Sequence, residues 1–227
     1  MTPLLLAAGH VVAGTTRSAA RAAELARSGI EALVVDVFDR NALREVVVRV
    51  RPQVVVHQLT DLPQVLDPAA FGDWLKRNAQ LRIEGTRNLV DAAAAAGTPR
   101  LVAQSIAFAY AEGPEPHHET DPLAPADGDT PAAVSARGVR ALEEAVLAAP
   151  RMEGIVLRYG RLYGPGTWHL EARGRAPLHV DAAAHAALLA LTRGSPGIYN
   201  IAENDGAVTI EKARRELGFE PAFRMAN

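Results

Sequence analysis

The sequence predicts an α/β fold in which a parallel sheet is covered by helices on both faces. Three short apolar runs, HVVAGTT, EALVVDV and QVVVH, alternate with Ala/Arg/Glu-rich stretches that have helical spacing. Continuous apolar strands are typical of a sheet buried on both faces, and alternation with helices is typical of parallel connections. With 227 residues, 48% of them hydrophobic, the chain can bury one sizeable core. We therefore expect a single domain over residues 1–227.

The first part of the chain begins with the end of one helix and then contains two complete predicted helices. Residues 1–8, MTPLLLAA, have the character of the last turns of an apolar helix, and a strand is predicted over His10–Thr16. Helices are predicted over Arg17–Ser28 and Asn41–Val50. The cap residues that mark their ends are Ser18, Gly29 and Asn41. Because the chain starts inside a strand-and-helix repeat, we expect a segment to be missing upstream.

The rest of the chain continues the same alternation. The run of five alanines before Gly97 fits the end of a long helix closed by a left-handed glycine. In order, we expect a helix over Phe71–Ala96, the strand RLVAQSI, a loop over Tyr110–Pro131, a helix over Val134–Ala148, the strand GIVLRYG, a helix over Asp181–Arg193, the strand GIYNIA and a helix over Thr209–Leu217.

Composition excludes several classes of function. The net charge is −2, from 24 basic and 26 acidic residues, so no surface for nucleic acid or anionic lipid is expected. No apolar run reaches bilayer-spanning length, and Met1–Gly9 lacks the features of a secretory signal. We therefore expect a cytoplasmic protein. The chain has no cysteine, which excludes disulfides, thiolate nucleophiles and cysteine metal sites.

Six segments together resemble the extended and atypical short-chain dehydrogenases, the NAD-dependent epimerase/dehydratase family. They are HQLTDLP, NAQLRIEGTRNLVDAAAAAGTPRLVAQS, LRYGRLYGPGT, LHVDAAAHAALLAL, GIYNIAEND and EKARRELGFEPAF, in the family's order over nearly the whole chain. The resemblance implies a Rossmann-like doubly wound sheet that binds a dinucleotide at its switch point. It also implies a nucleotide-binding core over residues 1–160 and a substrate-side lobe over residues 161–227. This lobe is reduced, because the chain skips family segments after GPGTWH and after IAEND, which favours a small substrate.

The first departure from the family is at the N-terminus, where its first strand and G-x-x-G-x-x-G loop are missing. Glycines of that loop let the backbone approach the pyrophosphate at a helix N-terminus. Gly160, Gly164 and Gly166 follow a late strand and do not replace it. The missing strand leaves two open strand edges. Either HVVAGTT and QVVVH pair directly, or another segment fills the gap, as in a homodimer, or the gene model starts too late.

The second departure is the absence of the catalytic Y-x-x-x-K pair, in which lysine lowers the pKa of the tyrosine so that it can pass a proton. Four tyrosines lack a lysine four residues later: Tyr110, Tyr159, Tyr163 and Tyr199. With Tyr110 aligned to the family's S-x-x-x-Y ending, Ser105 precedes the catalytic serine position and Ile106 occupies it. The standard proton relay is therefore absent.

The resemblance nevertheless suggests positions for a cofactor. Arg17 ends a strand where the family recognises the adenosine ribose, and an arginine there favours NADP(H) over NAD(H); the alternative is a solvated helix residue. Asp36 ends the next strand and either meets the adenine or caps a helix. Val37 follows Asp36 and is expected to contact the cofactor as well. The other expected cofactor-binding residues are three in the loop over the nicotinamide, His57, Gln58 and Leu59, and two at strand ends, Ser105 and Tyr159. Without the glycine loop, we expect impaired dinucleotide binding.

Catalytic candidates lie at or just beyond the ends of strands, where open α/β sheets bind ligands. They are His57, Ser105, Tyr110 and Tyr163, and Arg158 and Tyr159 lie close by in the sequence. His57 has the pKa range of a general acid or base, or it positions the backbone. The others form a polar cleft floor or pack as buried hydroxyls. Asn78 and Arg82 lie one helical turn apart and could face either the cleft or solvent, and the solvated face is favoured.

Two histidine clusters suggest metals, but neither has the spacing of a known site. Adjacent His117 and His118 cannot easily bind one ion, so the acidic, proline-rich loop that holds them is expected to be a mobile lid. Asp181 and His185 share a helix face, and the resemblance makes Asp181 the helix cap. We therefore expect no metal site.

Three hypotheses about function remain. The first is an NAD(P)-dependent epimerase/dehydratase or reductase with a degenerate cofactor site, acting on a small molecule. The second is a cofactor-independent isomerase, cyclase or lyase on the same scaffold. The third is a non-catalytic protein that binds a ligand or partner. We favour the first, an enzyme, because of the family resemblance.

Overall fold

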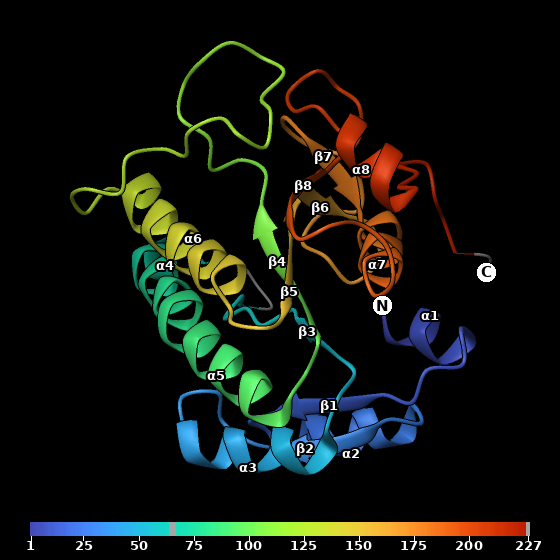
Figure 1. Cartoon of the computed structure of the whole chain (residues 1–227). Coiled ribbons are helices and arrows are strands. Elements are labelled where there is room, and N and C mark those ends of the chain that lie inside the picture. Colours follow the sequence, from blue (N-terminus) through green and yellow to red (C-terminus); the bar gives the residue numbers. More distant parts are fainter. Residues whose placement is uncertain (64–66, 226–227) are drawn as a thin grey trace.

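The centre of the protein is a four-stranded parallel sheet in the order β3 (Val54–His57), β4 (Arg100–Ile106), β5 (Glu153–Tyr159) and β8 (Gly197–Ile201). A computed structural model describes residues 1–63 and 67–225. Figure 1 shows helices α4, α5 and α6 on one side of this sheet and α7 and α8 on the other. The predicted α/β class, a Rossmann-like parallel sheet with flanking helices, is confirmed.

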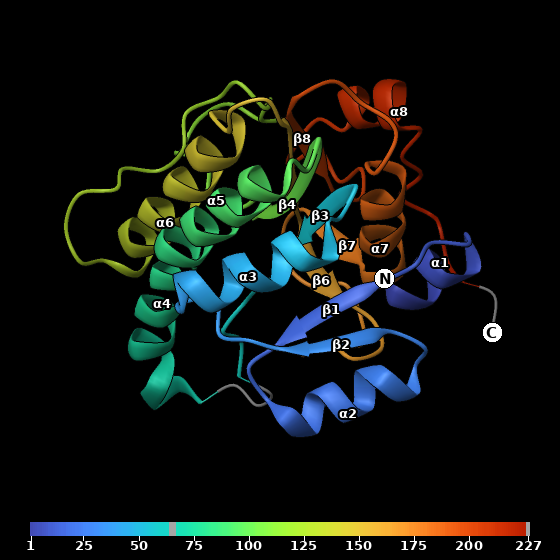
Figure 2. The same ribbon diagram turned by 60° about the horizontal axis from the view of Figure 1, so that its bottom comes forward.

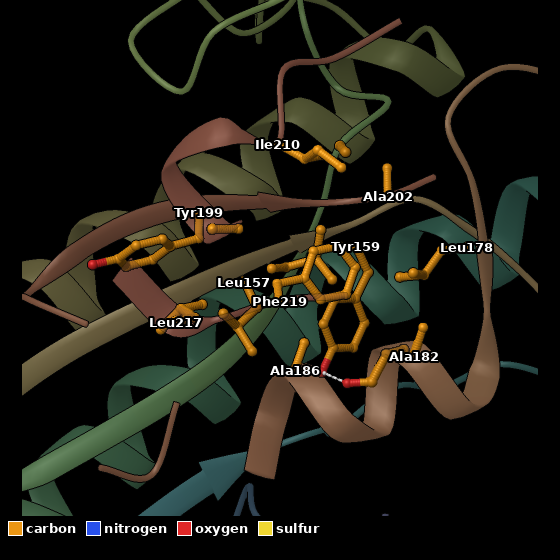
Figure 3. Close-up of a cluster of buried hydrophobic side chains, with 14 of the residues drawn as sticks. Leu157, Tyr159, Leu178, Ala182, Ala186, Tyr199, Ala202, Ile210, Leu217 and Phe219 are labelled. Carbon is orange, nitrogen blue, oxygen red and sulfur yellow. Dashed lines mark hydrogen bonds between the residues drawn. The ribbon is translucent and has the colours of Figure 1, made fainter. Parts of the chain in front are cut away.

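Alternation along the strands divides the core into two layers. Leu101 and Ala103 of β4 pack with α5 (Thr86–Ala96) and α6 (Pro131–Leu147). Val102, between them, faces the opposite layer, which contains α7 (Val180–Leu189) and α8 (Glu211–Leu217). Successive side chains of a strand point to opposite faces, so apolar residues at every position require cover on both. Figure 3 shows this second layer, with Tyr159 and Tyr199 among its largest side chains.

The N-terminal part forms a separate two-stranded parallel sheet. Strands β1 (Ala13–Thr16) and β2 (Glu31–Val34) pair with each other, and α1 (Thr2–Ala7), α2 (Ala19–Arg27) and α3 (Arg40–Val50) belong to the same part of the chain. Figures 1 and 2 both show this pair set apart from the central sheet. Within residues 1–63 and 67–225, β1 and β3 share no ladder. The alternative in which HVVAGTT pairs directly with QVVVH is therefore wrong.

The long helix predicted over residues 71–96 is continuous but not uniform. It consists of α4 (Phe71–Gln80), a π-helical turn (Leu81–Gly85) and α5, after a short 3₁₀ turn (Pro68–Ala70). Gly97 ends it at φ +73°, as predicted. A π turn adds one residue and rotates the helix face. It therefore changes which side chains of this helix face the sheet.

Several local predictions are corrected. Asp39, not Asn41, caps α3, because its carboxylate accepts the Ala42 amide. His179, not Asp181, caps α7. Helix α6 begins at Pro131 instead of Val134, and Thr130 is its N-cap. The sequence pattern also missed a short parallel pair, β6 (Arg161–Tyr163) and β7 (Pro177–His179).

The helices leave no candidate for a membrane span. In the described part of the chain, none of them combines the length and apolar character needed to cross a bilayer.

Candidate functional site

The central strands all run in the same direction, so their carboxyl ends meet at one edge of the sheet. His57, Ile106 and Tyr159 end β3, β4 and β5 at this edge. Ligands of open α/β sheets bind outside the carboxyl ends of strands. This edge and the loops that leave it are the candidate site.

Beneath this edge lies a buried ion pair between β5 and α6. Arg158 donates to both carboxylate oxygens of Glu143, from Nε to Oε1 at 2.9 Å and from Nη2 to Oε2 at 2.7 Å. The Ser105 hydroxyl donates to the same Oε1 at 2.7 Å, and Ser105 is fully buried. A bidentate arginine–carboxylate pair fixes geometry as well as charge. The position of Ser105 therefore fits a structural link between strand and helix, and its predicted catalytic and cofactor roles stay predictions.

Tyr110 connects the loop after β4 to β8. Its hydroxyl donates to Asn200 Oδ1 at 2.6 Å, and its ring stacks on the His117 ring with centroids 4.8 Å apart. Burial raises the pKa of the Tyr110 hydroxyl, although the nearby Arg158 opposes the shift. The phenol is therefore protonated at neutral pH, and this proton is donated to an amide.

The acidic loop that follows is tied to the body of the protein. The backbone of His117 exchanges hydrogen bonds with Ala207 and Thr209, and the Arg158 guanidinium donates to the Glu119 carbonyl at 3.2 Å. The Glu119 carboxylate accepts the Asn200 amide at 3.0 Å. These contacts anchor the centre of the segment that was expected to be a mobile lid. They also engage the Glu119 carboxylate as the acceptor of the Asn200 backbone amide.

The two tyrosines of strands β5 and β6 have different environments. Tyr159 lies in the core and donates to the Ala183 carbonyl of α7 at 2.9 Å, the dashed line in Figure 3. Burial raises its pKa. Tyr163 is half-buried, donates to Glu203 at 2.5 Å and accepts from Arg224 at 3.0 Å. Of the two, only Tyr163 can meet a ligand without disturbing the core.

His57 is buried between β3 and the start of α5. Its Nε2 lies 2.8 Å from the Thr86 hydroxyl, and its Nδ1 accepts the Leu59 amide at 3.2 Å. Burial, assisted by the positive charge of Arg82, lowers the pKa of His57 to about 4. The ring is therefore neutral at physiological pH with both nitrogens engaged, which favours backbone positioning over acid–base catalysis.

The side chain of Gln58 reaches across the sheet edge. Its Nε2 donates to the Tyr159 hydroxyl over 3.4 Å, and Gln58 and Leu59 lead from β3 into the loop above the edge. Their assignment to the nicotinamide end of a dinucleotide stays a prediction.

At the other sheet, Arg17 lies in an ion-pair cluster. Its guanidinium donates to Asp61 Oδ1 at 3.0 Å, and Arg77 donates to Asp61 Oδ2 at 2.8 Å. Both arginines, led by Arg77, lower the pKa of the Asp61 carboxyl. Asp36 accepts the Phe38 amide and so shapes the turn before α3, and the Val37 carbonyl accepts the side chain of Asn88. Arg17 is an exposed cation at this end of the expected dinucleotide site.

The prediction that Asn78 and Arg82 face solvent is wrong. They are 4% and 6% exposed, on the side of the helix that faces the loop after β3. Asn78 Oδ1 accepts the Asp61 amide at 3.1 Å. No local pattern signals this burial, because it depends on packing of the helix against the loop after β3, which is distant in the sequence.

The histidine clusters do not form metal sites in the described residues. His117 Nδ1 lies 3.3 Å from the Asp121 carboxylate, and His179 Nδ1 lies 3.7 Å from that of Asp181. His185 stacks on Phe223 with centroids 3.9 Å apart. In residues 1–63 and 67–225, no group of three or more His, Asp or Glu side chains is arranged to hold an ion.

A cavity of about 310 Å³ opens beyond the carboxyl end of β4. Phe108, Tyr110 and His117 are aromatic residues of its wall, and Arg175 and Glu115 form an ion pair at its side. A cavity with aromatic walls and a few charged groups is typical of a small-molecule site.

Comparison with known proteins identifies the family. The family model "NAD dependent epimerase/dehydratase family" matches residues 1–178. The chain belongs to this family. A relative named 3-diazoavenalumate denitrifying reductase, from Streptomyces sp, is 41% identical over 242 aligned positions, covering 96% of this chain and 77% of the relative.

Solved structures of the family share the fold. UDP-glucose 4-epimerase from Thermotoga maritima matches with a TM-score of 0.78 at 18% identity, over 98% of this chain and 89% of the epimerase. The NAD complex of the Thermus thermophilus UDP-glucose 4-epimerase matches with a TM-score of 0.69 at 25% identity, over 96% and 79%. The site is therefore compared with the sites of this family.

Sequence reasoning missed three residues of the site. Glu143 and Asn200 are buried hydrogen-bond partners of the predicted residues Ser105 and Tyr110. Arg82 was predicted on the wrong face. Nothing in ALEEAV marks which of its two adjacent glutamates is buried. The position of Asn200 next to the last residue of β8 places it at the ligand edge, which was a usable signal.

Proposed function

We propose that the protein is a nicotinamide-dependent reductase that replaces the diazo group of a small organic carboxylate with hydrogen. The observation that carries the proposal is the missing proton relay: the only tyrosine that aligns with the family's serine–tyrosine segment, Tyr110, has Pro114 four residues later and gives its proton to Asn200. Carbonyl reduction needs a proton donor, whereas replacement of dinitrogen does not. The name of the 41% identical relative agrees with that chemistry.

The chain has residues that suit the two ends of a dinucleotide. Arg17, beside an exposed strand end, suits a 2′-phosphate, and Gln58 and Leu59 lie at the nicotinamide end. In residues 1–63 and 67–225, no strand-to-helix turn supplies the glycine loop for the pyrophosphate, so we expect weaker binding than in the family's other members. When bound, a dihydronicotinamide supplies hydride.

The residues around the cavity suit the substrate. In a diazonium substrate the carbon–nitrogen bond breaks, dinitrogen leaves with the bonding electrons, and hydride forms the new carbon–hydrogen bond with its own pair. No proton is taken up. Phe108 and Tyr110 line the cavity with aromatic carbon for a planar ring, and Arg175, which pairs with Glu115 at the side of the cavity, supplies a cation that a substrate carboxylate can share.

Deuterium labelling tests the reaction. We expect an aryl diazonium carboxylate, given NADPH deuterated at C4 in ordinary water, to yield product with one deuterium at the carbon that carried nitrogen, faster than without protein. Mass spectrometry of the product measures it. Tyr163→Phe should stay within about tenfold of wild type, since loss of a general acid costs about 10²–10⁴-fold. Solvent hydrogen at that carbon, or a rate equal to the protein-free reaction, would refute the proposal.

Cofactor preference is tested at Arg17. We expect Arg17→Ala to weaken NADPH about tenfold and to leave NADH unchanged, because only NADPH carries the 2′-phosphate that a charged hydrogen bond can hold. Calorimetric titration of both nucleotides measures the difference. Arg21→Ala is the matched control, an exposed arginine of α2, the helix that follows Arg17, paired with Glu24. Equal weakening of both nucleotides by Arg17→Ala would contradict the 2′-phosphate assignment.

A further inference from the structure

Arg161, the first residue of β6, contacts two segments that line the cavity beyond β4. Its backbone N–H donates to the Ala176 carbonyl at 2.7 Å, and its Cδ would lie 3.2 Å from a Cβ placed on Gly174. At the end of the side chain, the guanidinium carbon lies 4.4 Å from the centroid of the Phe108 ring. Ala176 and Phe108 both line the cavity. The arginine side chain therefore runs from one lining segment to another, at the rim of the cavity.

These contacts hold the Arg161 side chain in place, although the residue is exposed. Gly174 has a φ of +67° and leaves the space that the middle of the side chain occupies. The guanidinium is attracted to the Phe108 ring by the negative charge of the ring face. Ordering a long side chain when a ligand binds costs affinity, so a cation that is already held binds an anion more tightly. Arg161 is therefore a prepared cation beside the cavity.

The residues that line the cavity do not supply enough positive charge for an anion. The ionisable ones are Glu112, Glu115, His117 and Arg175, and Arg175 is paired with Glu115. The ion pairs within residues 1–63 and 67–225 do not include Arg161. A guanidinium that lies over a ring keeps its in-plane N–H groups for other acceptors. Arg161 therefore supplies the positive charge that the lining lacks.

We propose that Arg161 binds the carboxylate of the substrate and so selects planar aromatic carboxylates. This inference rests on the proposed function, whose substrate carries such a group. A guanidinium can hold both carboxylate oxygens through two parallel N–H bonds, which fixes the orientation of the substrate as well as its charge. Arg175 can share the anion only in competition with Glu115. Arg161 is thus a specificity-determining residue, and a neutral analogue of the substrate gains nothing from it.

The binding of cinnamate and cinnamamide tests this assignment. Both compounds have the same planar shape, and only cinnamate is charged. By calorimetry, Arg161→Gln should bind cinnamate about tenfold or more weakly than wild type and should bind cinnamamide equally well, because only a charged hydrogen bond is lost. Arg161→Lys keeps the charge without the planar fork and should recover part of the affinity. Arg173→Gln is the matched control, an exposed arginine between β6 and β7 that does not line the cavity, and should behave as wild type.

Turnover separates this inference from the proposed function. With NADPH and an aryl diazonium carboxylate, Arg161→Gln should raise KM about tenfold and leave kcat unchanged, because the carboxylate is bound equally before and during hydride transfer. Equal cinnamate affinity in Arg161→Gln and wild type, or no preference of wild type for cinnamate over cinnamamide, would overturn the inference even if the diazonium is reduced. Cinnamate binding that depends on Arg161, with no reduction of the diazonium, would support the carboxylate site and overturn the proposed reductase.

Discussion

Replacing Glu143 with alanine is expected to lower the free energy of unfolding by about 3–5 kcal/mol, the cost of breaking a buried ion pair. The change leaves Arg158, whose side chain is 3% exposed, without its bidentate partner. It also removes the acceptor of the Ser105 hydroxyl. Small domains have only about 5–15 kcal/mol of stability in total, so much of it depends on this one carboxylate. Urea denaturation followed by circular dichroism measures the loss.

Two variants show whether the loss comes from the pair. Glu153→Gln removes the carboxylate of an ion pair with Arg100 at the surface, where Glu153 is 55% exposed, and should cost less than about 1 kcal/mol. The double variant Glu143→Leu/Arg158→Leu should lose less than Glu143→Ala, because it leaves no unpaired charge. If Glu143→Ala costs no more than Glu153→Gln, the pair does not hold the strands and helix together.

This ion pair also matters for the site. Arg158 connects the sheet, α6 and the acidic loop, because it contacts Glu143 and the Glu119 carbonyl. The guanidinium carbon of Arg158 also lies 4.9 Å from the centroid of the Tyr110 ring. The cavity beyond β4 is lined by that loop. The loop can therefore define a substrate cavity because a charged network beneath it fixes its base.

The sequence was a good guide to the order of the elements. Apolar runs and helical spacing depend on local period, so the central strands and the main helices could be predicted to within a few residues. Local pattern could not show the π turn over residues 81–85 or the short pair β6–β7, because both depend on packing between distant segments.

The candidate site was harder to predict, for a physical reason. Its strand-end residues follow from topology, and His57, Ser105 and Tyr110 do lie near the ligand edge. Whether a polar group faces solvent or a buried partner depends on contacts that sequence spacing does not encode. Arg82 and Glu143 illustrate this, since each is a charged residue on a helix that the period alone would place equally well outside.

His57 should make the protein less stable in mild acid. Its pKa is about 4 in the folded protein and about 6.5 in an unfolded chain. The unfolded chain therefore binds a proton first as the pH falls. Stability is complete above about pH 6.5, falls between pH 6.5 and 4, and loses up to about 3 kcal/mol, since a tenfold difference in proton affinity between the two states is worth about 1.4 kcal/mol. Urea unfolding at a series of pH values measures this loss.

The variant His57→Gln isolates the contribution of the histidine. A glutamine amide can donate to Thr86 and accept the Leu59 amide, but it does not titrate, so the difference in stability between pH 7 and pH 4 should shrink. His185 and Asp61, whose pKa values are also lowered, are unchanged in the variant and cancel in the comparison. Identical pH dependence in both proteins would show that His57 is not held neutral by the fold.

The same titration separates positioning from catalysis. If the ring only positions the loop after β3, turnover should show no limb near pH 4, where His57 titrates in the folded protein. His57→Gln should then keep both the pH profile and the nucleotide affinity, because its amide oxygen can accept the Leu59 amide in place of Nδ1. A general acid or base would instead give a limb that disappears with the histidine. A profile with such a limb would show that His57 acts as a general acid or base in the reaction. It would favour the cofactor-independent chemistry over hydride transfer.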